Sequence, residues 1–120
     1  MKIEKRILDQ IENNLDVRWG KATNNGVFTC EAYIHDLPQP VGLVWYGFFG
    51  GNKTIVILDS YVMEKYRRLG IRTKIHNVMI ESYKNCISTI MTQAGTKYSL
   101  PWLKKMKFKQ NQDGDWILKL

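Results

Sequence analysis

The sequence predicts an α+β domain with a central mixed sheet, in the element order α-β-β-β-α-β-α-β-β. Three strand-like segments joined by short turns indicate an antiparallel meander. A helix framed by two apolar segments then indicates one βαβ unit with parallel strands at the centre of the sheet. With 120 residues, 44% hydrophobic and 24% charged, the chain fits a single globular domain over residues 1–120.

The first half of the chain is expected to form one helix and three strands. Residues 1–14 place Ile3, Ile7 and Ile11 on one face of a helix, with charged residues opposite. Residues 18–26 are rich in Asn and Gly and are expected to be a loop, so the chain would lack a first strand there. Aromatic and β-branched residues then predict strands at 27–35, 41–49 and 53–63.

The second half is expected to complete the βαβ unit and to end in a hairpin. A helix of about four turns begins at Gly70, and the strand at 86–94 follows it, parallel to the strand at 53–63. We expect a V-shaped opening between these two strands at Val62. Residues 99–108 predict a short helix with Ser99 as its N-cap, and 107–120 a hairpin around Asp113-Gly114.

The positive charge is concentrated in one half of the chain. Residues 1–60 carry six basic and seven acidic side chains, whereas residues 61–120 carry twelve and four, so the halves have net charges of −1 and +8. This asymmetry favours an anionic partner such as nucleotide phosphates, nucleic acid or an acidic protein, with a solvated basic face as the alternative.

Several classes of protein are disfavoured by composition. There is no run of about 20 apolar residues and no apolar leader, so we expect a cytoplasmic protein without a membrane association. Cys30 and Cys86 are far apart and are expected to be buried free thiols in a reducing compartment. Two cysteines and two histidines show no ligand spacing, so no metal is expected.

The segment around Gly70 has the features of an anion site. Arg67, Arg68 and Arg72 flank this glycine at the start of a helix. The first N–H groups of a helix have no internal acceptors, and the helix dipole places positive charge at the same end. Backbone and side chains therefore both favour a bound anion such as phosphate.

Residues 62–75 resemble the signature of the GNAT superfamily of acyl-CoA-dependent N-acetyltransferases, [QR]-x-x-G-x-[GA] followed by a small or hydroxyl residue. The resemblance covers roughly residues 26–120 through element order, "PVGLVWYGFF" upstream and "WLKKMKFK" downstream. It implies acetyl-CoA as co-substrate, with its pyrophosphate on the loop and its pantetheine beside the strand at 53–63. The implied cofactor-binding residues are Ser60, Val62, Arg67, Arg68, Leu69, Gly70, Ile71, Arg72 and Thr73.

The resemblance also implies how acetyl transfer would proceed. An amine attacks the thioester, a backbone N–H at residues 60–62 stabilises the oxyanion, and a base or a water chain removes a proton. Asp59 is the only carboxylate on its strand and is the candidate base, with Tyr61 as a second polar group nearby. The alternative for Asp59 is a structural bond to a turn or a lysine.

Two departures from the signature concern the chemistry. Arg72 occupies the second small position, and Leu103 occupies the position of the tyrosine that serves as general acid in the family. Tyr98 and Ser99 are candidate substitutes, although packing for Tyr98 and helix capping for Ser99 are the favoured alternatives. His76 is expected to have a packing or surface role.

Three functions therefore remain open. The first is an acetyl-CoA-dependent N-acetyltransferase acting on a primary amine of a protein or small molecule. The second, supported by the two departures, is a catalytically degenerate GNAT-fold binding or structural protein that retains CoA binding. A nucleic-acid-binding module ranks last because no groove-reading motif is present. The acceptor is not identified, and a monomer or a homodimer is equally expected.

Overall fold

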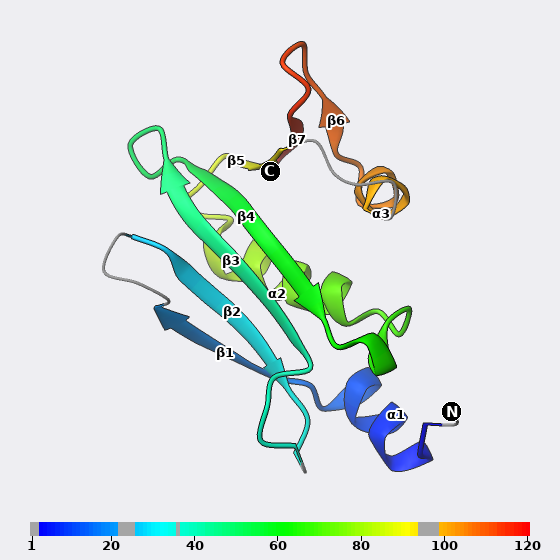
Figure 1. The fold of residues 1–120 in the computed structure, drawn as a ribbon. Coiled ribbons are helices and arrows are strands. Elements are labelled where there is room, and N and C mark those ends of the chain that lie inside the picture. The colour runs from blue at the N-terminus through cyan, green and yellow to red at the C-terminus, as the bar shows by residue number, and fades with distance from the viewer. Residues whose placement is uncertain (1–2, 22–25, 36, 94–98) are drawn as a thin grey trace.

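A computed structural model describes residues 3–21, 26–35, 37–93 and 99–120. They form one seven-stranded mixed sheet with the strand order β1-β2-β3-β4-β5-β7-β6 and three α-helices (Figure 1). The mixed α/β fold predicted from the sequence is confirmed. The strands are β1 (Asp16–Lys21), β2 (Phe28–Tyr33), β3 (Gly42–Phe49), β4 (Thr54–Val62), β5 (Thr89–Thr92), β6 (Lys109–Gln110) and β7 (Trp116–Lys119), and the helices are α1 (Lys5–Asn13), the 3₁₀ turn η1 (Glu64–Tyr66), α2 (Ile71–Tyr83) and α3 (Leu100–Lys105).

The expected strand pairings are present. β2, β3 and β4 form the antiparallel meander, and β4 pairs in parallel with β5 across the α2 crossover. β5 then pairs with β7, and β6 and β7 form the final hairpin. The βαβ unit therefore lies at the centre of the sheet, as predicted.

The sequence-based expectation for residues 18–26 was wrong in part, because β1 begins at Asp16 and ends at Lys21. It pairs antiparallel with β2, from Asp16 opposite Tyr33 to Lys21 opposite Phe28. Most of its side chains are exposed and Gly20 interrupts its apolar pattern, as is common in edge strands. Pairing with β2, rather than a local apolar pattern, makes this segment a strand.

Helix α2 packs closely against one face of the strands (Figure 1). Its buried side includes Ile71 and Ile75, which lie over Gly42 of β3. A Cβ atom at Gly42 would be 2.6 Å from Cγ2 of Ile71, so only glycine permits this approach. Helix α1 contributes Ile7 and Ile11 to the same core.

The parallel pairing of β4 and β5 ends halfway along β4. It runs from Thr54 opposite Thr89 to Ile57 opposite Thr92. The next residue, Leu58, is a bulge without a partner on β3, and the rest of β4 pairs only with β3 among the described residues. The two strands therefore part at Leu58, and not at Val62 as expected.

The two cysteines have different environments. Cys30 is buried, and this burial raises the pKa of its thiol to about 12. Cys86 is a free thiol as expected, but it is exposed, so its predicted burial was wrong. Within the ranges that the structure describes, no helix has the length and apolar character needed to cross a membrane.

Candidate functional site

The start of α2 presents unpaired backbone donors next to the opening between β4 and β5. Gly70 is the N-cap, with φ 84° and ψ 11° in the left-handed region that favours glycine. The first helical bond runs from Lys74 N to Gly70 O at 3.0 Å, so the N–H groups of Ile71, Arg72 and Thr73 have no acceptor within the helix. Three predicted cofactor-binding residues therefore present donors to one place.

The three arginines of the signature take different directions. Arg67 is exposed, and its Nε donates to the carbonyl of Val62 at 2.9 Å. Arg68 is also exposed and has a left-handed φ of 68°. Leu69, between these arginines and Gly70, is half-buried and packs against the hydrophobic core. The backbone of the loop is therefore anchored while two cationic side chains remain in solvent.

Arg72 turns inward instead. Its guanidinium carbon lies 4.0 Å from the centroid of the Trp102 ring, a cation–π contact between α2 and α3. Its Nη1 is 3.5 Å from Oγ of Ser99, a long hydrogen bond. Burial lowers the pKa of the Arg72 guanidinium, and the negative charge of Asp59 partly offsets this effect.

A small cavity of about 10 Å³ lies beside Arg72, between β4, α2 and α3. His76 is 2% exposed, and its Nε2 has no hydrogen-bond partner among the described residues. Burial, followed by the positive charge of Arg72, lowers the pKa of His76 to about 4, so the ring is neutral near pH 7. The cavity is lined by Val44, Ile57, Ser60, Arg72, His76, Met79 and Trp102.

The aromatic surroundings of His76 agree with the packing role expected from the sequence. Its ring lies edge-on to Trp102, with centroids 5.2 Å apart, and 5.5 Å from the ring of Phe108. Trp102 also donates its Nε1–H to Oγ1 of Thr73 at 2.9 Å. The sequence did not single out Trp102 as a site residue, yet it contacts three side chains of α2.

The predicted residues of β4 are divided between the two faces of the sheet. Ser60 lies opposite Val44, and Val44 lines the cavity on the α2 face. Because side chains alternate along a strand, Asp59 and Tyr61 lie on the opposite face, and both are exposed. Val62 lies on the α2 face, opposite Gly42.

Asp59 and Ser60 interact directly. The backbone N–H of Ser60 donates to Oδ1 of Asp59 at 2.8 Å. The candidate base therefore accepts a bond from one of the candidate oxyanion donors. An oxyanion could use the Ser60 N–H only after the carboxylate has moved away.

The next question is where the residues at and near the expected general-acid position lie. Leu103 is 1% exposed and belongs to the core, so its side chain faces away from solvent. Ser99 occupies the N-cap position of α3 but makes no side-chain capping bond, so the favoured capping role was wrong. Tyr98 lies outside the described residues.

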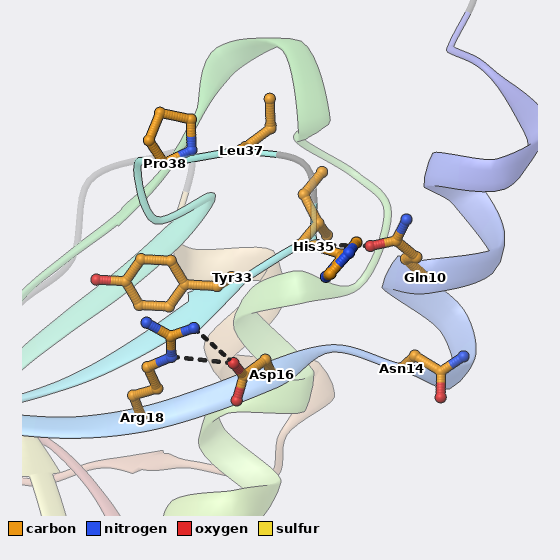
Figure 2. A pocket seen from close by; sticks show the side chains of 9 residues that line it. Gln10, Asn14, Asp16, Arg18, Tyr33, His35, Leu37 and Pro38 are labelled. Atoms are coloured by element: carbon orange, nitrogen blue, oxygen red, sulfur yellow. Dashed lines mark hydrogen bonds and ion pairs between the residues drawn. The ribbon is translucent and has the colours of Figure 1, made fainter.

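A larger cavity of about 610 Å³ lies at the other edge of the sheet, between α1, β1 and the segment after β2 (Figure 2). Arg18 pairs with Asp16 at 2.9 Å and lies 4.3 Å from the centroid of Tyr33. The backbone N–H of His35 donates to Gln10 at 2.6 Å. Thr29 of β2 pairs with Trp45 of β3, and Trp45 pairs with Asp59 of β4. Tyr33 is four residues further along β2 than Thr29, so this cavity is about 15 Å from the opening of β4.

Comparisons with solved structures identify the fold. An IAA acetyltransferase from Bacillus cereus superposes with a TM-score of 0.73 at 14% identity, over 89% of this chain and 100% of that one. A GNAT-family acetyltransferase from Staphylococcus aureus gives 0.70 at 17% identity, over 100% and 82%. A candidate streptothricin acetyltransferase from Bacillus anthracis, solved with acetyl coenzyme A, gives 0.65 at 18% identity, over 83% and 66%.

At these identities the likeness defines the architecture. The chain has the GNAT acetyltransferase fold, which confirms the fold expected from the signature. No family model matches the sequence, and no curated protein matches it either. In the described part of the chain, no group of three or more His, Cys, Asp or Glu side chains is arranged to hold a metal ion.

Proposed function

We propose that the protein binds acetyl-CoA and transfers its acetyl group to a primary amine. One observation carries this proposal: β4 and β5 part at Leu58 beside a helix that begins with a left-handed glycine and unpaired N–H groups. This arrangement offers a phosphate site and an extended strand edge in one continuous region. The fold it shares with known acetyltransferases supports the same reading.

The phosphates of acetyl-CoA would bind at the start of α2. The donors are the N–H groups of Ile71, Arg72 and Thr73, with Arg67 and Arg68 supplying charge from solvent. Apart from its chain neighbours, no described residue has an atom within 4 Å of a Cβ added at Gly70, so a phosphate can approach the backbone. The pantetheine arm would then follow the edge of β4 toward Leu58.

The transfer step would depend mainly on β4. Backbone N–H groups at residues 60–62 would stabilise the oxyanion, and Asp59 would accept a proton through water after releasing the Ser60 N–H. A thiolate leaves without strong acid assistance, so the buried Leu103 is compatible with slow turnover.

A binding protein that has lost turnover is the second candidate. It is favoured by the absence of a proton donor at Leu103 and by the inward position of Arg72. The acceptor amine distinguishes the candidates: only the enzyme releases free CoA when a primary amine is added to acetyl-CoA.

The proposed site is tested by Gly70→Asp and Gly70→Asn. Both side chains tolerate a left-handed φ, and they differ only in charge. Gly70→Asp should weaken acetyl-CoA binding, measured by calorimetry, by about tenfold or more relative to Gly70→Asn, because its carboxylate repels the phosphates. Equal affinities for the two variants would exclude the start of α2 as the phosphate site.

A further inference from the structure

The Arg72 side chain extends into the space between β4 and α3, beside the strand that the acyl-pantetheine arm follows in the proposed function. It starts from the first turn of α2 and ends on Trp102 of α3, beside Ser60 of β4. The signature that residues 62–75 resemble has glycine or alanine at this position, so a long side chain is not expected there. Here a long side chain fills the space between the strand and the helix.

Little space remains beside the guanidinium. The cavity beside the guanidinium measures about 10 Å³, which is about the volume that one water molecule requires. An extended chain of methylene and amide groups cannot enter unless a side chain leaves. Arg72 is the lining residue that can leave most readily, because its long flexible chain begins in the first turn of α2, two residues after the solvent-exposed Gly70.

The bonds that hold Arg72 inward are few. With the described residues it makes one cation–π contact and one long hydrogen bond, although a guanidinium has five N–H donors. None of the ion pairs found among the described residues involves it. Asp59 attracts this half-buried cation but forms no ion pair with it, so a phosphate placed near the backbone of Arg72 will draw the guanidinium outward, to where Arg67 and Arg68 already lie in solvent.

The neighbouring His76 gives a second indication that the inward position of Arg72 is not its only position. Its buried Nε2 lines the same cavity and has no hydrogen-bond partner in the described part of the chain. Buried polar atoms are normally paired, and such an exception needs an explanation. Departure of Arg72 would open space at this nitrogen for a polar group of the ligand.

We propose that Arg72, stacked on Trp102, is a plug that closes the acyl-pantetheine passage, and that the phosphates of the incoming ligand open it by drawing the guanidinium outward. This inference rests on the proposed function and adds its regulation. The site would select phosphorylated pantetheine thioesters and refuse the same thioester without its nucleotide.

The test compares three probes: acetyl-CoA, acetyl-pantetheine, which lacks the phosphates, and adenosine 3′,5′-bisphosphate, which lacks the arm. The variant is Arg72→Ala, which keeps the helix and introduces the residue type of the signature. Calorimetry should show that Arg72→Ala binds acetyl-pantetheine about tenfold or more tightly than the wild type does. It should bind the bisphosphate no more tightly than the wild type, because a cation is lost.

Arg68→Gly is the matched control, since it removes one arginine of the same loop without touching Trp102. Glycine suits its φ of 68°, so the backbone is preserved. This variant should weaken binding of acetyl-CoA and of the bisphosphate and leave acetyl-pantetheine binding as weak as in the wild type.

The outcomes separate the two proposals. If wild type binds acetyl-CoA and Arg72→Ala gains nothing for acetyl-pantetheine, the plug is overturned and the proposed function stands. If neither protein binds acetyl-CoA or the bisphosphate, the proposed function fails and the plug with it. If Arg72→Ala binds acetyl-CoA and the wild type does not, Arg72 closes the passage. The proposal that the phosphates open it would then be overturned.

Discussion

Individual residues show how environment, and not residue type, assigns roles in this protein. The sequence placed Arg72 among the cofactor-binding residues, but its guanidinium lies on Trp102, thirty positions further along the chain. It also gave Ser99 a capping role, whereas the hydroxyl contacts Arg72. Both contacts depend on how α3 docks against α2, and no local pattern encodes that docking.

His76 gives a prediction at the same scale, because its charge is suppressed in the folded state. Its pKa is lowered from 6.5 to about 4, so between these values the unfolded chain binds more protons than the folded one. The contribution of His76 to the free energy of unfolding should be fully present above about pH 6.5, and up to roughly 3 kcal/mol should be lost as the pH approaches 4. Urea unfolding as a function of pH would measure this loss.

His76→Phe should remove this component and reduce the difference in stability between pH 6.5 and 4.5, because phenylalanine does not titrate. His35→Gln is the control, since it removes an exposed histidine and leaves the buried surroundings of His76 intact. If stability depends on pH in His76→Phe as it does in the wild type, then His76 is charged in the folded protein over this pH range.

At the scale of elements, the position of α2 is set by one glycine. An added Cβ at Gly42 would lie 2.6 Å from Ile71 and 3.0 Å from Ile75, so Gly42→Ala must push the helix away from β3. Such overpacking typically costs about 1–3 kcal/mol, which denaturant unfolding would detect. Acetyl-CoA affinity should fall too, because the first turn of α2 moves.

Gly47→Ala provides the comparison on the same strand. Its added Cβ would lie 3.6 Å from the nearest atom, the carbonyl oxygen of Gly26, which is an ordinary contact. This variant should be neutral or slightly stabilising, since alanine is less flexible than glycine. Similar losses for both variants would show that packing against α2 is not the reason for the glycine.

The elements that could be predicted from sequence are those with a strong local signal. Strands β2, β3 and β4 follow from runs of β-branched and aromatic residues, and the final hairpin from Asp113-Gly114. Strand β1 has no such signal and exists because β2 offers it an edge. The opening at Leu58 could not be placed because it depends on where β5 ends, thirty-four residues further along the chain.

For the whole molecule, the proposed function would use the distribution of charge and the opening of the sheet for the same ligand. Residues 61–120 carry a net charge of +8 and include both the first turn of α2 and α3. Phosphates would therefore approach a positive surface, while the pantetheine arm would enter between uncharged backbone edges. The nucleic-acid alternative uses the same charge but has no need of the opening.

The dependence of affinity on salt concentration distinguishes acetyl-CoA binding from nucleic-acid binding. Acetyl-CoA affinity should fall steadily as NaCl is raised from about 50 to about 500 mM, because salt screens the attraction between the phosphates and the exposed arginines. Acetyl-pantetheine binding to Arg72→Ala should change little over the same range, since that ligand has no charge. A short DNA duplex should bind weakly near physiological salt, and Gly70→Asp should affect it far less than it affects acetyl-CoA. If the duplex instead binds more tightly than acetyl-CoA at every salt concentration, the basic half is a nucleic-acid surface.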